Sequence, residues 1–391
     1  MRPLEGLKIL DFSTLLPGPY ATMTLADLGA DVLRVTTNTR VDMLDVTPPL
    51  LPGSEFSAAA AQLGRNKRSI LLNLRSAAAI DIVKELITEY DIVIEQFRPG
   101  VMEKLGLGYE DLSSINPKLI YCSITGYGQN TEWSARAGHD INFLSLGGVP
   151  GYSGRIGQAP SLDGVQIGDL VGGTQNAIVS ILAAVYSREK TGEGQYLDVA
   201  MTDGVLALHA IWGPGTLLTG ESPEPEGTLL NGGTLYDYYE TSDGKFMSFA
   251  GLEPKFWEGF CLLMEKPEWI SLTVDAGDAV KNEVREIFKS KTRAEWEATF
   301  RSVDVCAEPV LSLTEALNSD YAKKREMVVD VPSENGENLR QIGCPYKFSK
   351  TPAAFQFAGR PADIQQTREN LSRFGFSDEQ IIQWEAEGVL K

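Results

Sequence analysis

The stretch GLKILDFSTLLPGPYATMTLADLGADVLRVT, residues 6–36, establishes the expected fold. Its first part, GLKILDFS, has the apolar run of a buried strand, and PGPYATMTLADLGA predicts a helix that starts near Pro19 and ends at Gly29. The residues that follow, DVLRVT at 31–36, predict a second strand. A helix that joins two strands in this way makes the strands parallel, so the segment is a βαβ unit.

The same order of elements recurs farther along the chain. RSILLNL at 68–74 and DIVIEQF at 91–97 predict strands on either side of a helical stretch, and KLIYCSITGYG at 118–128 predicts a strand that ends in glycines. Residues 169–192 predict a long helix. We therefore expect an α/β fold with an open, Rossmann-like doubly wound sheet, in which ligands bind at the carboxyl ends of the strands.

A chain of 391 residues is long enough for two domains. The βαβ pattern predicts a large α/β domain over 1–200 and 320–391. The Gly, Pro and Glu-rich residues 201–229 predict an exposed linker. A hairpin pattern at 236–251 indicates a smaller α+β domain over 230–319.

The chain carries a formal net charge of −18, so most of its surface repels polyanions. This charge argues against nonspecific binding to nucleic acid or to anionic lipid. The four cysteines lie far apart, without the spacing of a metal or redox motif. The chain shows no signal-peptide core and no apolar run of about 18 residues. We expect a cytoplasmic protein that does not span a membrane.

His139 is one of only two histidines, and it lies in AGHDINFLSLGGV, residues 137–149. A histidine beside an apolar run is more often structural than catalytic, and His209 in GVLALHAIW is interpreted in that way. His139 differs because it follows the glycine-rich turn after a predicted strand, where an α/β sheet presents ligand-contacting groups. Imidazole also titrates near neutral pH. His139 is therefore a candidate acid/base.

Asp169 opens the predicted long helix, and capping is the ordinary explanation for an aspartate there. Gly172 and Gly173 nevertheless weaken the first turn of the helix, which favours close approach of another backbone or of a ligand. The amide groups of a first helical turn also stabilise negative charge. Asp169 is therefore a candidate base or nucleophile.

Basic residues cluster in GRNKRSI, which contains Arg65 and Arg68, and Arg98 follows in FRPG. A solvated loop is the ordinary explanation for such a cluster. In so acidic a chain it also suits the phosphates of a nucleotide-like ligand, which guanidinium groups bind with two hydrogen bonds. Neither GxxxxGK[ST] nor GxGxxG after the first strand is present, so a P-loop and the usual dinucleotide fingerprint are unsupported.

Seven stretches of the chain carry a more specific pattern: LEGLKILDFSTLLPGPYATMTLADLGADVLRV, GRNKRSILLNL, VIEQFRPGVMEKLGLGYEDL, NPKLIYCSITGYGQ, AGHDINFLSL, GDLVGGTQNAIVSILAAVYSREKTGEGQYLDVAMTDG and LYDYYETSDGKF. On these stretches, over nearly its full length, the chain resembles the family III coenzyme A transferases, the CaiB/BaiF superfamily. Within that superfamily it is similar to the α-methylacyl-CoA racemase branch.

The resemblance implies an acyl-CoA substrate and a role for each candidate. In the racemases the aspartate at position 169 is an acid/base, partnered by the histidine of a GHDIN motif, here His139. His139 would serve the S face of the α-carbon and Asp169 the R face. The backbone N–H of Asp140 and a helix dipole would hold the enolate oxygen. Coenzyme A enters as part of the substrate, so no separate cofactor and no metal are implied.

The reaction explains why two such groups are needed. The α-hydrogen of a thioester is weakly acidic, so its removal requires a base in contact and stabilisation of the enolate oxygen. Inversion then requires a proton on the opposite face. Two acid/base groups that flank the α-carbon meet both demands.

The resemblance also implies an interlocked homodimer. Glu240 in YYETSDG matches the racemase glutamate that hydrogen-bonds the catalytic histidine, and in the family it comes from the partner subunit. Without the family it would be interpreted as a surface carboxylate of a hairpin. Arg65, Arg68, Arg98 and Lys104 lie in stretches where the family binds the phosphates and the adenine end of coenzyme A.

Two other hypotheses remain beside the racemase. In the transferases the aspartate at 169 is a nucleophile that forms an acyl anhydride and then an enzyme–CoA thioester, and the histidine of GHDIN is generally missing. A noncatalytic CoA-binding protein would not be expected to keep His139, Asp169 and Glu240 together. Residues 151–165 depart from the racemase pattern, so the resemblance does not extend to the acyl chain.

Overall fold

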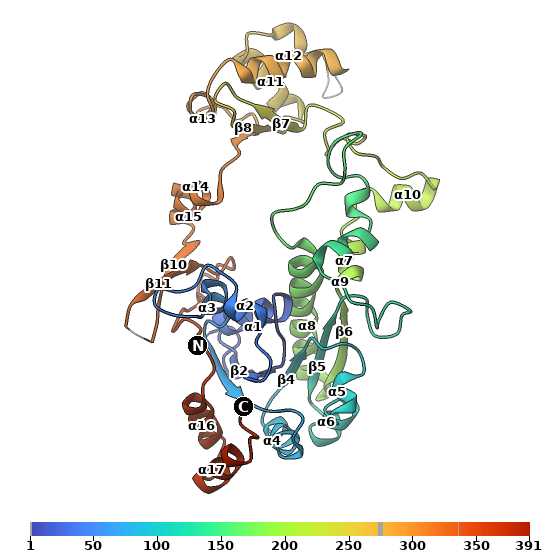
Figure 1. The fold of residues 1–391 in the computed structure, drawn as a ribbon. Coiled ribbons are helices and arrows are strands. Elements are labelled where there is room, and N and C mark those ends of the chain that lie inside the picture. The colour runs from blue at the N-terminus through green and yellow to red at the C-terminus, as the bar shows by residue number, and fades with distance from the viewer. Residues whose placement is uncertain (1, 273–276, 335) are drawn as a thin grey trace. The chain divides into compact units, whose positions relative to one another are not determined.

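Figure 1 shows a computed structural model of the chain, whose described residues are 2–272, 277–334 and 336–391. Contacts within the chain divide it into two compact units. The large unit comprises residues 1–147, 164–208 and 323–391, and the small unit comprises residues 148–163 and 209–322.

A parallel sheet of six strands forms the centre of the large unit. Its strands are β1 (Lys8–Asp11), β2 (Asp31–Thr36), β3 (Lys67–Leu71), β4 (Ile92–Glu95), β5 (Ile120–Thr125) and β6 (Gln195–Ala200). Their order is β3-β2-β1-β4-β5-β6, with every neighbouring pair parallel. This order confirms the predicted doubly wound sheet, and it places the switch in winding direction between β1 and β4, where such folds bind ligands.

Helices cover both faces of this sheet (Figure 1). The helices of the large unit are α1 (Pro17–Asp27), α2 (Met43–Val46), α3 (Ala58–Leu63), α4 (Ala77–Ile87), α5 (Val101–Lys104), α6 (Tyr109–Ile115), α7 (Asp140–Leu146), the π-helix η2 (Gly168–Gln175), α8 (Asn176–Thr191), α9 (Met201–Ala207), α16 (Ile364–Arg373) and α17 (Asp378–Ala386).

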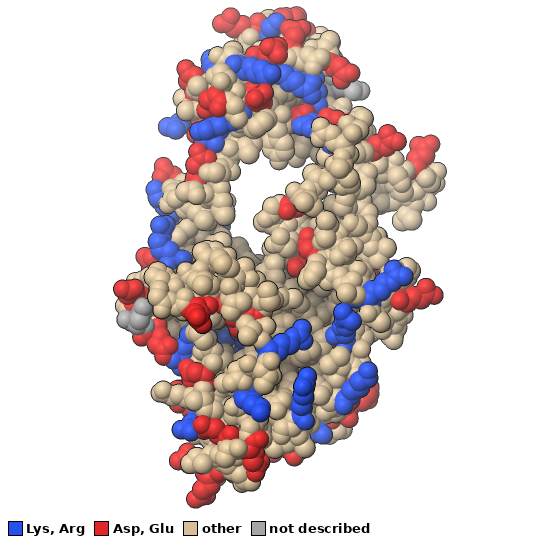
Figure 2. All heavy atoms as spheres, viewed as in Figure 1, with Lys and Arg blue, Asp and Glu red and all other residues tan. Residues whose placement is uncertain are grey.

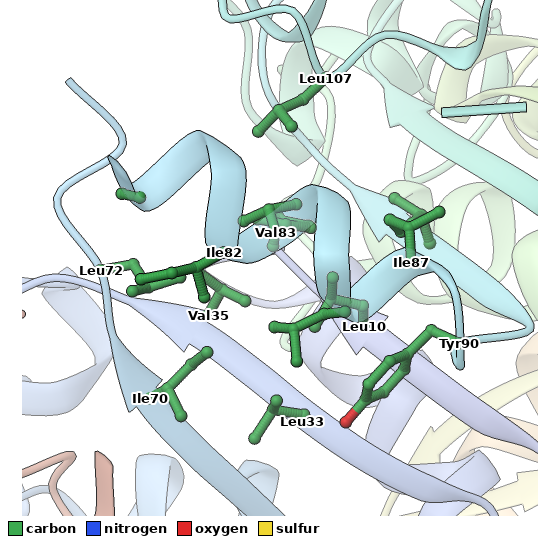
Figure 3. Packing of buried hydrophobic residues seen from close by; sticks show 14 of the residues in the cluster. Leu10, Leu33, Val35, Ile70, Leu72, Ile82, Val83, Ile87, Tyr90 and Leu107 are labelled. Carbon is green, nitrogen blue, oxygen red and sulfur yellow. The ribbon is translucent and has the colours of Figure 1, made fainter. Parts of the chain in front are cut away.

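Alternate strand residues face two separate cores. Ile9 and its neighbours Val32 and Ile92 belong to the core that contains α1 and α8. Leu10 and its neighbour Leu33 belong to the opposite core, which Figure 3 shows with α4 lying over the strands. Because both faces of the sheet are covered, the central strands β4 and β5 are buried along their whole length, and their sequences, IVIE and IYCSIT, are mostly apolar.

Helix α16, the second-to-last helix of the chain, covers the edge of the sheet at β3. The backbone N–H groups of Ser69 and Leu71 on β3 donate to Gln366 Oε1 and Thr367 Oγ1 at 2.8 and 2.9 Å. The amide nitrogen of Asn370 donates to the carbonyl of Ser69 at 3.0 Å. These side chains satisfy the unpaired groups of an edge strand and attach the end of the chain to the large unit.

The small unit contains an antiparallel sheet of order β7-β8-β9. Its strands and helices are η1 (Val149–Gly151), α10 (Gly213–Thr219), β7 (Asp237–Glu240), β8 (Phe246–Phe249), α11 (Pro254–Leu263), η3 (Pro267–Trp269), α12 (Gly277–Lys289), α13 (Arg293–Phe300), β9 (Ala307–Pro309) and α14 (Leu313–Asn318). The predicted hairpin is confirmed as β7 and β8. Helix α15 (Asp320–Lys324) and the hairpin β10 (Val328–Pro332) with β11 (Asn338–Ile342) follow.

The linker expected at 201–229 is shorter and more ordered than the sequence indicated. Helix α9 packs on η2, where a Cβ at Gly204 would lie 2.5 Å from Gly172 Cα, so 201–208 belong to the large unit. The Gly-rich start of the expected crossing forms α10, with a proline in its first turn and Gly220 at a φ of 76° as its C-cap. Proline at the start and glycine after the end are ordinary helix signals.

Residues 148–163 also differ from the expected boundary, which assigned them to the large domain. In the structure they belong to the small unit. Arg155 in this segment is ion-paired with Asp237 of β7 at 2.5 Å, a contact that residue spacing does not reveal.

One helical stretch among the described residues, Gly168–Thr191, is long and apolar enough to cross a membrane by length and composition alone. Its residues Ala177, Ile181 and Ala184 are buried in the core of the large unit. A core helix of a globular protein passes the same test, so the stretch is weak evidence for a membrane span.

The large unit contains a buried ion pair between Arg65 and Asp27, whose contribution to stability can be measured by substitution. Arg65 is fully buried, and its Nε and Nη2 donate to the two oxygens of Asp27 at 3.0 and 2.6 Å. We expect Asp27→Ala to lower the free energy of unfolding by about 3–5 kcal/mol, because it leaves the buried guanidinium without a counter-ion. Urea unfolding followed by circular dichroism measures this loss.

Asp31→Ala is the matched control. It removes the partner of Arg68 in a pair whose side chains are 45% and 21% exposed. We expect this substitution to cost less than about 1 kcal/mol. Equal losses in the two variants would contradict the structural role of the buried pair.

Candidate active site

The turn after β5 holds the segment that contains His139. Tyr127 in this turn packs edge-to-face on Phe143 of α7, with ring centroids 5.3 Å apart. A Cβ at Gly138 would lie 2.6 Å from Tyr127 Oη, and one at Gly126 would lie 2.4 Å from Phe143 Cε1. Neither position has room for a side chain, so the two glycines allow the segment to lie against the carboxyl end of β5.

His139 immediately precedes α7. Its backbone N–H donates to Asn142 Oδ1 at 3.0 Å, which fixes the entry into the helix. The imidazole makes no capping hydrogen bond to the helix, and the residue is exposed. The ring is therefore open to solvent and is not used to start the helix.

Asp140 joins the two candidate acid/base residues. Its Oδ1 accepts the backbone N–H of Asp169 at 3.0 Å. A Cβ at Gly168 would lie 3.0 Å from that oxygen and 3.3 Å from the Asp140 carbonyl, so a side chain there would be tightly packed against Asp140. The first turns of α7 and η2 are thus joined by a hydrogen bond, with position 139 directly before α7 and position 169 inside η2. The amino end of a helix favours negative charge nearby.

The π-helix η2 presents Asp169. A Cβ at Gly172 would lie 2.4 Å from the carbonyl oxygen of Met201, which confirms that this glycine permits close approach of another backbone. Thr174 Oγ1 donates to the carbonyl of Pro17 at 2.6 Å and ties η2 to the start of α1. π-Helical turns are rare and are frequent at functional sites.

The electrostatic setting of Asp169 suits proton transfer. Partial burial of the carboxyl group raises its pKa to about 6, and the Asp140 carboxylate adds to this rise. Positive charge on His139 acts in the opposite direction and lowers the pKa of Asp169. A carboxyl group with this pKa populates both its acid and its base form near neutral pH, as a general acid/base requires.

Glu240 lies in the small unit, whereas His139 and Asp169 lie in the large unit. It is the last residue of β7 and is exposed, with its carboxylate 3.7 Å from Lys289 Nζ. Within one chain its described partner is therefore this lysine, and its predicted contact with the histidine stays a prediction.

Two of the four basic residues expected to bind coenzyme A are engaged in the protein. Arg65 is fully buried, and besides Asp27 it donates to Gln341 Oε1 and the Ile342 carbonyl. It has no exposed donor for a phosphate, so we assign it a structural role. Arg68 donates to both oxygens of Asp31 at 2.7 Å. Both arginines also lie before or at the start of β3, away from the carboxyl edge where doubly wound sheets bind ligands.

Arg98 and Lys104 are placed differently. Arg98 lies in the loop after β4, beside the switch point of the sheet, and Lys104 ends α5; both are exposed. Figure 2 shows Lys and Arg side chains gathered on the face of the large unit that carries α5 and α6. These two residues could hold a phosphorylated ligand. Within the described residues no group of three His, Cys, Asp or Glu side chains is arranged to hold a metal ion.

Sequence reasoning missed a buried polar network at the end of β1. Lys67 Nζ donates to the Pro19 carbonyl at 2.8 Å and to Thr22 Oγ1 at 2.5 Å, and it lies 3.4 Å from Asp11 Oδ2. Burial lowers the pKa of Lys67 to about 8. The sequence feature that could have indicated this network is Asp11, an acidic residue directly after the apolar residues Ile9 and Leu10.

A second buried acid was also missed. Glu95 ends β4 and accepts the backbone N–H of Phe97 at 2.8 Å, and burial raises its pKa to about 7. It follows the apolar run IVI, so both strands that flank the switch point end in a buried carboxyl group. These acids shape the loops after β1 and β4.

Comparisons with known proteins identify the family of the chain. The model of CoA-transferase family III matches residues 4–364. Human alpha-methylacyl-CoA racemase is 34% identical over 394 residues, which cover 99% of this chain and 97% of the relative. Succinyl-CoA:mesaconate CoA-transferase of Haloarcula marismortui is also 34% identical, over 90% of this chain and 91% of the relative.

Among solved structures, a CAIB/BAIF family protein from Brucella suis superposes with a TM-score of 0.82 at 27% identity, covering 95% of this chain and 99% of that one. These two relatives are named for different reactions but are equally similar to this chain. The comparisons therefore identify the family but do not decide between the two reactions. The chain belongs to CoA-transferase family III.

Proposed function

We propose that this enzyme is a racemase that inverts the α-carbon of 2-methylacyl-CoA thioesters by two-base 1,1-proton transfer through an enolate. The observation that supports the proposal is the hydrogen bond from the Asp169 N–H to Asp140, which joins the first turns of α7 and η2. The exposed residue His139 directly precedes α7, and Asp169, whose carboxyl pKa is raised to about 6, lies in η2. The match to alpha-methylacyl-CoA racemase over nearly the full chain supports the same reaction.

In the proposed reaction one group removes the α-hydrogen and the other returns a proton. Asp169 abstracts the proton from the R substrate, and the electron pair of the C–H bond moves into an enolate whose charge rests on the thioester oxygen. The Asp140 backbone N–H, in the first turn of α7, stabilises that oxygen. Protonated His139 then delivers its proton to the opposite face, and the S substrate reacts in reverse.

The raised pKa of Asp169 suits a group that must both accept and donate a proton. In one direction of the reaction Asp169 must begin protonated. With a pKa of about 6, roughly 10% of the groups are protonated at pH 7, compared with less than about 0.1% for an ordinary aspartate. Burial beside Asp140 thus increases the active fraction about 100-fold.

The substrate would bring coenzyme A with it, and we propose no further cofactor. Arg98 and Lys104 are the basic residues proposed to hold its phosphates, because both are exposed near the carboxyl edge of the sheet. Arg68 would first have to leave Asp31.

We further propose that the enzyme acts as a homodimer, with Glu240 of the partner subunit supporting His139. Exposed apolar side chains are compatible with a large interface: Leu217 and Leu218 on α10 are 89% and 87% exposed, and Val179 and Tyr186 on α8 are 65% and 68% exposed. Soluble proteins usually cover such side chains with a partner when they lie together.

A CoA transferase is the second candidate, and the match to succinyl-CoA:mesaconate CoA-transferase favours it. In that reaction the Asp169 carboxylate attacks the thioester carbonyl and expels the CoA thiolate, which leaves an acyl anhydride. The thiolate then attacks the aspartyl carbonyl and releases the first acid. A second acid repeats the two steps in reverse order and leaves with coenzyme A. His139 has no part in these steps.

Deuterium incorporation separates the two reactions. In heavy water and without any acceptor acid, a racemase should exchange the α-hydrogen of a 2-methylacyl-CoA for deuterium. Mass spectrometry or NMR measures the deuterium at the α-carbon. His139→Ala should lower inversion by at least about 100-fold, because one of the two acid/base groups is lost, while CoA affinity stays nearly unchanged. Ser145→Ala, in the helix that follows His139, should behave like the wild type.

The transferase predicts the opposite result. No deuterium would enter, and borohydride would trap a CoA thioester on Asp169 once a donor and an acceptor acid are supplied. Full inversion activity in His139→Ala would also reject the assigned role of the imidazole.

The pH dependence tests the electrostatics of Asp169. For the R substrate, kcat/KM should fall as the pH drops below about 6, because the base becomes protonated. Asp140→Asn removes the negative charge that raises the pKa of Asp169 but keeps an oxygen to accept its N–H. The acid limb should therefore move to lower pH. A limb that stays in place or moves to higher pH would contradict this coupling.

Mixed dimers test the proposed sharing of the site. The His139→Ala and Glu240→Ala homodimers should each be nearly inactive. A dimer with one chain of each kind, isolated with two different affinity tags, should regain about half of the wild-type activity, because one of its two sites contains both residues. If Glu240 acts within its own chain, every site keeps one lesion and no activity returns.

A further inference from the structure

Arg155 makes a two-pronged ion pair inside the small unit. Its Nη2 and Nη1 donate to Asp237 Oδ1 and Oδ2 at 2.5 and 3.0 Å. Nη1 also donates to Glu226 Oε1 at 2.8 Å, and the backbone N–H of Ile156 donates to the other Glu226 oxygen at 3.0 Å. Asp237 is only 4% exposed, so water screens this pair weakly on its acidic side.

The surrounding chain is shaped to hold this pair. Gly232 has a φ of 100°, and a Cβ there would lie 3.4 Å from Arg155 Nη1 and 3.2 Å from Glu226 Cγ. Lys281 of α12 lies 2.8 Å from Asp237 Oδ2 and donates to the Gly232 carbonyl at 2.5 Å. The network therefore joins the segment around Arg155, the turn at Gly232, strand β7 and helix α12.

The segment that carries Arg155 has a special place in the chain. Residues 148–163 follow α7, which starts just after His139, and precede η2, which contains Asp169. The ion pair thus fixes the chain between the two candidate acid/base residues. The strand that receives the pair, β7, ends at Glu240.

We propose that Arg155 is a positioning residue for proton transfer: its ion pair with Asp237 anchors the connection between α7 and η2 on strand β7. The inference rests on the proposed function, because it assigns to this anchor an effect on His139 and Asp169. Arg155 acts by restricting the chain and does not contact the reacting atoms. A guanidinium suits this task because its planar fork matches both carboxylate oxygens, which an ammonium group cannot do.

Arg155→Lys preserves the positive charge but removes the guanidinium group that binds both oxygens of Asp237. We expect kcat for α-deuterium exchange to fall about 10- to 100-fold, the usual effect of a misplacement of about 1 Å, with KM for the acyl-CoA changed less than about threefold. Amide hydrogen exchange should become faster in peptides from 148–163 and stay unchanged in peptides from β1 and α4.

Two controls separate positioning from general destabilisation. Arg285→Gln removes a cation that lies 3.7 Å from Asp237 without forming the fork, and it should keep the wild-type kcat and amide exchange. In Arg155→Ala, millimolar guanidinium should restore part of kcat, whereas the same concentration of sodium chloride should not. A protein that is merely less stable would gain nothing from guanidinium.

Unchanged kcat in both Arg155 variants would overturn the proposal. So would a reduced kcat with wild-type amide exchange in residues 148–163, or a loss that guanidinium does not reverse. If the wild-type protein moves CoA between acids without α-exchange, the proposed function fails, and the same comparison is made with the transfer rate. If it catalyses neither reaction, amide exchange alone still decides whether Arg155 anchors the segment.

Discussion

Parallel pairing of strands that are buried on both faces is the constraint on which the large unit depends. Each connection between such strands must cross a face of the sheet, so helices cover both sides, and all carboxyl ends meet at one edge. The order β3-β2-β1-β4-β5-β6 reverses its winding between β1 and β4. The loops after these strands, and those after β5, are therefore placed where a ligand can meet several of them.

At that edge, close contacts between backbones substitute for long side chains. A Cβ at Gly138 or Gly172 would clash, and one at Gly168 would lie only 3.0 Å from Asp140 Oδ1. The three glycines allow the turn after β5, α7, η2 and α9 to approach one another. One consequence is the hydrogen bond from the Asp169 N–H to Asp140. It brings a second carboxylate near Asp169, so the contact that builds the site also raises the pKa of the candidate base.

The relatives of this chain include a racemase and a CoA-transferase, which are named for two different reactions of CoA thioesters. In the two proposed reactions Asp169 acts either as a nucleophile on the thioester carbonyl or as a base on the hydrogen of the neighbouring carbon, and these two carbons are one bond apart. In the proposed racemase, the imidazole of His139 supplies the proton that inversion needs. The anchor at Arg155 addresses a related demand, because two groups that act on opposite faces of one carbon tolerate little relative movement.

The sequence by itself determined the doubly wound sheet, the hairpin of the small unit and the candidates His139 and Asp169, because strand periodicity, glycines and the GHDIN and GDLVGG motifs are local features. Tertiary structure alone decided the rest. Arg65 resembled a phosphate ligand in the sequence, yet its partner Asp27 lies 38 positions away, and burial makes it structural. The same holds for the Asp140–Asp169 bond, the buried Lys67 and the pairing of Arg155 with Asp237. Charge partners and burial depend on long-range packing, which local spacing does not encode.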